Sequence, residues 1–193
     1  MALFTASALR ARASLEGYFT EEGRREHAKR VLLNEVRAAA SRTSTYDIFL
    51  SHASEDAILI KALRDELVDA GFTVYVDWID DPQLDRSRVT TETAAVLRQR
   101  MRQCRCLLFA TSQAARQSVW MPWELGYMDA LTTARVAIVP IVPEHEADRD
   151  FRGQEYLGLY PYIDKTGAAL YVHRDRSRYV RFADWLNQRL DPR

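Results

Sequence analysis

In YDIFLSHASEDAILIKALRDELVDAG, residues 46–71, a strand pattern runs directly into an amphipathic helix pattern. YDIFLS, residues 46–51, is a short segment of β-forming type. The stretch after it places Glu55 and Asp56 in a first helical turn and ends at Gly71, which is a typical helix stop. Its apolar positions at helical spacing are Leu59, Ala62, Leu63 and Leu67. This is one strand–helix unit of an α/β sheet.

The same alternation continues to the end of the chain. CRCLLFA is near-continuous in apolar residues, as a strand covered on both faces is. Further strands are predicted at residues 72–76, 104–110, 136–142 and 168–172. Helices are predicted around residues 89–101, 118–131 and 179–190. We therefore predict the α/β class, with a parallel sheet and helices on both of its faces.

The first 45 residues differ from the rest of the chain in composition. Residues 7–40 are rich in Ala, Arg, Glu and Leu and are interrupted near residues 17–23, which predicts a short helix, a turn and a longer helix. SRTST, residues 41–45, has the composition of a linker. We predict an N-terminal helical extension and linker over residues 1–45 and a globular domain over residues 46–193.

Composition excludes several classes of partner. Lys plus Arg equals Asp plus Glu at 27 each, so no overall field attracts nucleic acid or an acidic membrane. No apolar run approaches membrane-spanning length, and an Arg interrupts the region where a signal core would lie. We expect a cytoplasmic protein with no nucleic-acid or membrane partner. The two cysteines, Cys104 and Cys106, are expected to be buried and reduced.

Polar and aromatic residues follow the predicted strands at their carboxyl ends, where open parallel sheets bind their ligands. These candidates are Ser51, His52, Asp77, Trp78 and Ser112, with Glu124 at the start of the next helix. Three of them have a simpler interpretation as well. Asp77 is of a type that forms turns, and Ser51 and His52 could lead into a helix cap.

Glu124 lies in SVWMPWELGYMDAL, residues 118–131, which reads as a helix capped by Ser118. Helical spacing places Trp120, Glu124, Tyr127 and Leu131 on one face. A carboxylate near a helix N-terminus also stabilises its own helix, and Trp120 could simply be a core aromatic. The pattern alone therefore leaves a functional and a structural interpretation open.

The sequence does not contain the motifs of several common enzyme and nucleotide-binding classes. There is no GxGxxG, no GxxxxGK[ST] and no GxSxG. Residues 109–111 lack the Asp that a phosphate-accepting receiver would carry after its third strand. Glu144, His145 and Glu146 are adjacent in a loop, without a spacing that converges on one ion. We expect no metal.

Three segments together resemble the Toll/interleukin-1 receptor (TIR) domain, in particular its bacterial branch. They are YDIFLSHASED, GFTVYVDW and SVWMPWEL, and the resemblance extends over about residues 46–190. It implies a flavodoxin-like five-stranded parallel sheet and cleavage of NAD+ at the nicotinamide–ribose bond. The segment Trp120–Leu125 looks like the family's catalytic-glutamate motif, which implies a catalytic role for Glu124.

The resemblance also implies surroundings for Glu124. NAD+ would be the substrate, with no separate cofactor, and Trp78 or Trp120 would offer a flat face to one of its rings. The residues that would line the site are Ser51, His52, Asp77, Trp78, Ser112 and Trp120. The product stays open among ADP-ribose, a cyclic nucleotide and a conjugate. The family implies activation by self-association, bacterial anti-phage defence, and a separate effector protein that senses a nucleotide product.

Two other functions fit the same sequence. One is a non-catalytic TIR module that only assembles with other proteins. The other is a different N-glycoside-cleaving enzyme of nucleoside deoxyribosyltransferase type, which also uses a carboxylate.

Overall fold

The structure is a computed structural model, and it describes residues 1–15, 45–81, 84, 90–112, 114–131, 135–148, 151, 153 and 155–187. Its strands are β1 (Phe4–Thr5), β2 (Tyr46–Ser51), β3 (Val74–Tyr75), β4 (Cys104–Thr111), β5 (Arg135–Val142), β6 (Tyr162–Thr166), β7 (Ala169–His173) and β8 (Tyr179–Arg181). Its α-helices are α1 (Ala6–Leu15), α3 (Ala57–Asp69), α4 (Asp77–Asp80), α5 (Thr91–Arg102), α6 (Trp120–Ala130) and α7 (Phe182–Leu186). Short 3₁₀ turns are η1 (Ser54–Asp56), η2 (Ala114–Gln117), η3 (Glu144–Glu146) and η4 (Glu155–Leu159).

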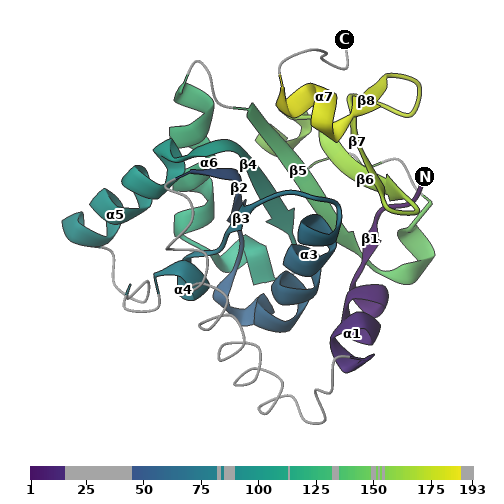
Figure 1. The fold of residues 1–193 in the computed structure, drawn as a ribbon, viewed down its shortest axis with the longest axis horizontal. Helices are drawn as coiled ribbons and strands as arrows, with labels where there is room; N and C mark the ends of the chain where they lie inside the picture. Colours follow the sequence, from purple (N-terminus) through teal and green to yellow (C-terminus); the bar gives the residue numbers. More distant parts are fainter. Residues whose placement is uncertain are drawn as a thin grey trace.

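One sheet organises these elements in the order β3-β2-β4-β5-β6-β7-β8, and β1 pairs with β5. The pairs from β3 through β6 are parallel, whereas β6–β7 and β7–β8 are antiparallel. Numbered from β2, the five parallel strands follow the order 2-1-3-4-5, which is the flavodoxin-like order. The predicted α/β class is confirmed, and the sheet is extended beyond the five expected parallel strands (Figure 1).

The extension corrects the predicted position of the fifth strand. Residues 168–172 were expected to form it, but they fall in β7, which runs antiparallel to β6. The fifth parallel strand is β6, which contains Asp164 and Lys165 and so has no continuous apolar run. Gly167, with φ of +59°, makes the tight connection between the two strands. The start of the segment predicted as a closing helix is β8, and α7 follows it.

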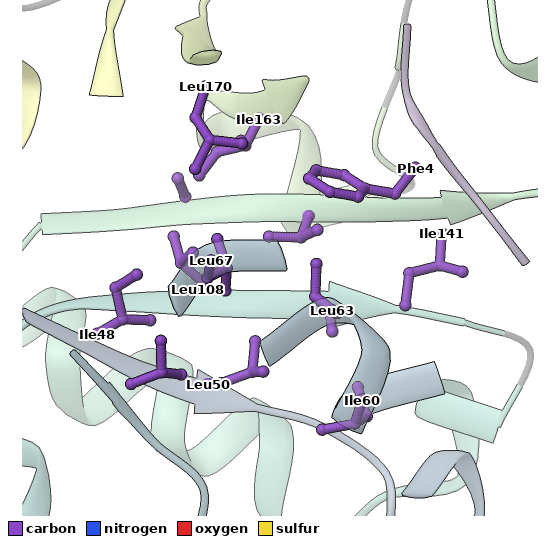
Figure 2. Packing of buried hydrophobic residues seen from close by; sticks show 14 of the residues in the cluster. Phe4, Ile48, Leu50, Ile60, Leu63, Leu67, Leu108, Ile141, Ile163 and Leu170 are labelled. Carbon is purple, nitrogen blue, oxygen red and sulfur yellow. The ribbon is translucent and has the colours of Figure 1, made fainter. Parts of the chain in front are cut away.

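Two apolar clusters lie on opposite faces of the sheet, because alternate strand residues point to opposite sides. Along β2, Ile48 and Leu50 belong to one cluster and Phe49 to the other. The first cluster includes residues of α1, α3 and α7, and Figure 2 shows its central members. The second cluster includes residues of α5 and α6. Helices therefore cover both faces, as predicted.

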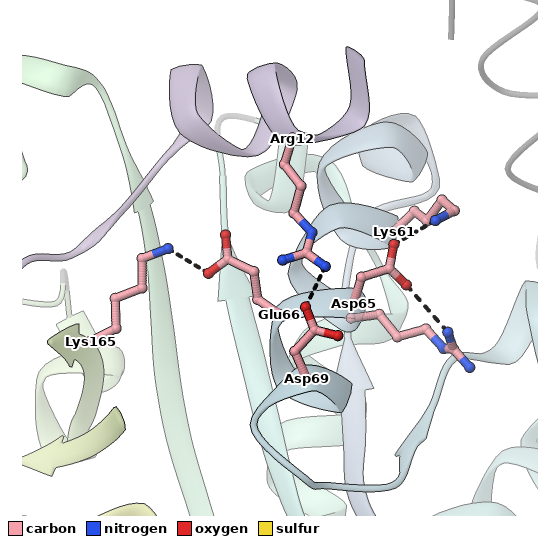
Figure 3. A network of polar contacts seen from close by, with 7 residues as sticks. Arg12, Lys61, Asp65, Glu66, Asp69 and Lys165 are labelled. Carbon is pink, nitrogen blue, oxygen red and sulfur yellow. Dashed lines mark hydrogen bonds and ion pairs between the residues drawn. The ribbon is translucent and has the colours of Figure 1, made fainter. Parts of the chain in front are cut away.

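The N-terminal residues pack on this sheet. Phe4 in β1 pairs in register with Ile141 of β5, and Phe4 and Leu9 are fully buried. α1 lies beside α3, where Arg12 forms an ion pair with Asp69 at 2.7 Å (Figures 1 and 3). The predicted first helix is thus present as α1. The predicted second helix and most of the linker lie outside the described residues, and the division at residue 45 stays a prediction.

Both cysteines are buried and unbridged, as expected. Burial raises the pKa of the Cys104 and Cys106 thiols, which keeps them in the unreactive protonated form. Among the described helices, none is long and apolar enough to cross a membrane.

Candidate active site

Glu124 lies in the second turn of α6 and has no exposed surface. The N-cap residue of α6 is Val119 and not Ser118 as predicted, but the Ser118 hydroxyl still accepts a hydrogen bond from the backbone N–H of Met121 at 3.3 Å. Met121, Leu125 and Met128 bury the same side of the helix against the sheet. The helix is thereby held by apolar contacts while it presents a carboxylate to the interior.

Ser51 is the last residue of β2 and contacts Glu124 directly. Its Oγ donates a hydrogen bond to Oε2 of Glu124 at 2.6 Å, and both side chains are 0% exposed. This contact joins residues 73 positions apart in the sequence. The strand-end rule predicted that the two would lie close together, and the structure places them in contact.

His52 points to a different set of neighbours. Its Nδ1 lies 2.8 Å from the carbonyl oxygen of Leu50, and Nε1 of Trp78 donates to its Nε2 at 2.6 Å. Because an indole N–H can only donate, we assign Nε2 as the acceptor and place the proton on Nδ1. Asp77 Oδ1 lies 3.4 Å from the same Nε2. His52, Asp77 and Trp78 thus form a cluster around a neutral imidazole, and the chain links this cluster to Ser51 because His52 follows Ser51 directly.

Ser112 follows β4 and is engaged with the start of α3. Its hydroxyl donates to the carboxylate of Asp56 and accepts a hydrogen bond from the backbone N–H of Ala115 at 3.0 Å. Asp56 was recognised in the sequence only as a residue of a first helical turn. Its pairing with Ser112 joins two carboxyl-end loops across adjacent strands.

Trp120 is 5% exposed and belongs to the apolar cluster between α6 and the sheet. Its ring lies edge-to-face with that of Trp123, with 5.5 Å between centroids. Trp78 is only partly buried. Of the two aromatic side chains expected to face a substrate ring, Trp78 therefore has more open surface.

A polar network behind α4 was not predicted from the sequence. Arg100 of α5 donates two hydrogen bonds to Asp81, at 2.7 and 2.8 Å, and the Tyr75 hydroxyl donates a third at 2.8 Å. The Tyr46 hydroxyl donates to Asp80 at 3.1 Å. The acidic run that begins at Asp77 resembles a solvated loop in sequence, because its partners lie on other elements.

This arrangement suits the stabilisation of positive charge. A carboxylate that is fixed in position and shielded from water interacts strongly with a cationic centre beside it. Within the described ranges, no three potential metal-ligating side chains gather at one point. The roles of Glu124 and its neighbours, and the expected absence of a metal, stay predictions.

Comparison with known proteins links this geometry to a family. The family model described as "TIR domain" matches residues 48–179. The chain is similar to a protein of Bacillus cereus (strain MSX-D12) named "Probable 3′ cyclic ADP-D-ribose synthase ThsB′", with 44% identity over 83% of this chain and 86% of that protein. It is also similar to "Putative cyclic ADP-D-ribose synthase TIR2" of Cytobacillus dafuensis, with 30% identity over 51% of this chain and 25% of that protein.

Proposed function

The chain belongs to the TIR domain family, and on that premise we propose that it cleaves the nicotinamide–ribose bond of NAD+ and closes the ADP-ribosyl group into a cyclic product. The observation that carries the proposal is the buried carboxylate of Glu124 at the carboxyl end of the parallel sheet. The cyclic product is proposed from the names of the two relatives.

Glu124 would act on the charge that bond cleavage creates. The bond between ribose C1 and the pyridinium nitrogen breaks, and its electron pair leaves with neutral nicotinamide. The ribosyl centre becomes oxocarbenium-like, and a carboxylate beside it stabilises that cation. A hydroxyl or ring nitrogen of the same molecule then attacks the centre and gives the cyclic product. A hydroxyl loses its proton in this step, and water in its place gives ADP-ribose.

Access to Glu124 requires movement in this scheme. Its side chain has no exposed surface, so the ribose reaches the carboxylate only after neighbouring groups rearrange. The partly buried Trp78 is hydrogen-bonded to His52, the residue that follows Ser51, and is our candidate for the ring-contacting side chain. We include self-association as the event that drives this rearrangement. A bacterial defence role, with a separate effector that senses the cyclic product, completes the proposal.

The decisive experiment follows nicotinamide release from NAD+ by the concentrated protein and separates the products by chromatography. Glu124→Gln preserves the side-chain shape and an acceptor for Ser51 but removes the charge. We expect release to fall at least about 100-fold, in line with the loss of a group that stabilises a transition-state charge. Glu92→Gln, at an exposed position of α5, is the matched control and should keep wild-type activity.

Each outcome has a clear meaning. Equal release by the wild-type protein and Glu124→Gln would show that Glu124 is not catalytic. If linear ADP-ribose is the single product, the proposed bond cleavage stands and the proposed cyclisation is wrong. A protein that self-associates but releases no nicotinamide at any concentration would be an interaction module.

A further inference from the structure

We propose that Ser51 is a positioning residue, which orients the Glu124 carboxylate for the reaction and does not itself bind the substrate. The inference rests on the proposed function. Its basis is the 2.6 Å hydrogen bond from Ser51 Oγ to Glu124 Oε2, between two side chains that are both fully buried. A contact this short is typical of a hydroxyl that donates to an ionised carboxylate.

Ser51 can hold the carboxylate because its own backbone is fixed. β2 lies between β3 and β4 in the interior of the sheet, and Ser51 is in register with Phe109 of β4. Strand alternation sends Ser51 to the same face as Phe49, which belongs to the cluster under α6. The Ser51 hydroxyl therefore points from the rigid end of β2 toward α6, the helix that contains Glu124.

The long side chain of Glu124 makes such a contact more important than it would be for an aspartate. A glutamate side chain has three rotatable bonds, so the packing of α6 fixes where the side chain starts but not how its carboxylate is turned. One hydrogen bond from the strand end restricts that last rotation. A displacement of about 1 Å in a reacting group can reduce a rate about 100-fold, so the contact matters for catalysis.

The expected effect of the contact is on turnover. Ser51→Ala removes the donor with little change in volume, and we expect kcat for nicotinamide release to fall about 10- to 100-fold. The KM for NAD+ should stay within about threefold, because a group that acts only through Glu124 contributes no uniform substrate binding. Ser51→Thr retains the hydroxyl and should recover most of the lost kcat.

A matched control comes from the opposite end of the sheet. The Thr73 hydroxyl donates to the Asp47 carboxylate at 3.0 Å, just before β3 begins. Thr73→Val removes that hydrogen bond while it keeps the side-chain shape. We expect wild-type kcat for Thr73→Val, and its melting temperature is compared directly with that of Ser51→Ala.

The outcomes separate this proposal from the proposed function. Wild-type kcat in Ser51→Ala, together with an inactive Glu124→Gln, overturns the positioning role and leaves the catalytic assignment intact. A rise in KM at unchanged kcat makes Ser51 a substrate contact and also overturns it. Activity in Glu124→Gln overturns the proposed function itself. If Ser51→Ala does not fold, Ser51→Cys serves in its place, because a thiol is a weaker donor of similar size, and wild-type kcat in that variant overturns the positioning role.

Discussion

Asp80 is a largely buried acid whose titration affects the stability of the protein. Burial, the largest cause, raises the pKa of Asp80 from its ordinary value of 3.8 to about 6. Hydrogen bonds from the Val76 backbone N–H at 2.7 Å and from the Tyr46 hydroxyl act in the opposite direction. Between pH 3.8 and about 6 the folded protein therefore binds more protons at this site than the unfolded chain.

The contribution of Asp80 to the free energy of unfolding falls as pH rises through that window, and well above pH 6 the buried charge opposes folding in full. Asp80→Asn should raise the free energy of unfolding by about 1–2 kcal/mol at pH 8, since one pKa unit corresponds to about 1.4 kcal/mol and partial exposure reduces the effect. Denaturant unfolding at pH 3.5 should show little gain. An equal gain at both pH values would contradict the assignment.

The sequence predicted that Ser51 and Glu124 lie close together, but it did not predict the hydrogen-bond partners of the other candidate residues. Ser51 and Glu124 were placed together because parallel strands end at one edge of a sheet. The acceptor of Ser112 is Asp56, and the neutral state assigned to His52 depends on Trp78. These contacts depend on side-chain geometry between residues 26 to 56 positions apart, which no local pattern contains.

Arg100 of α5 makes a bidentate contact with Asp81, the residue that follows α4, and so joins the two helices. Asp81 is buried, so loss of the guanidinium leaves its charge with fewer donors. We expect Arg100→Ala to lower the free energy of unfolding by about 2 kcal/mol, below the usual range for fully buried pairs because Arg100 is partly exposed. Arg100→Lys should recover only part of this, because an ammonium lacks the planar fork.

Urea unfolding of these variants measures the effect. Arg102→Ala is the matched control, since Arg102 is exposed on the same helix and its guanidinium lies 5.9 Å from the centroid of the Tyr127 ring. It should change stability by less than about 1 kcal/mol. Equal losses in the two alanine variants would show that the Asp81 contact contributes nothing beyond surface charge.

Elements with a strong apolar pattern were predicted within about a residue, and those without one were not. β4 and β5 are near-continuous apolar runs, and β2 contains the apolar run Ile48, Phe49 and Leu50. β6 was missed because two of its five residues are charged, and both find partners in the folded protein. Asp164 lies 2.8 Å from Nε2 of His173, and Lys165 pairs with Glu66 of α3 (Figure 3). Contacts with residues distant in the sequence thus stabilise β6 as a strand although it contains charged residues.

The first 15 residues add β1 and α1 to the fold, and their backbone pairs with both β5 and β6. β1 continues alongside β5, while Ala2 exchanges two backbone hydrogen bonds with Lys165 of β6, at 2.9 and 3.1 Å. The ring of Phe4 lies 5.1 Å from the Lys165 ammonium. A strand of two residues has no periodicity, so the sequence predicted the helix here but not the strand.

Removal of residues 1–15 should therefore prevent stable folding, because Phe4 and Leu9 are fully buried in the first cluster. The point variant Phe4→Ala isolates the effect and should lower the free energy of unfolding by about 3–5 kcal/mol. For a chain of this length that corresponds to a fall of roughly 10 °C in melting temperature. Val68→Ala, at a position of α3 that is 41% exposed, should change it by less than about 3 °C. If the truncated protein instead has the same melting temperature as the full chain, residues 1–15 are a separable extension.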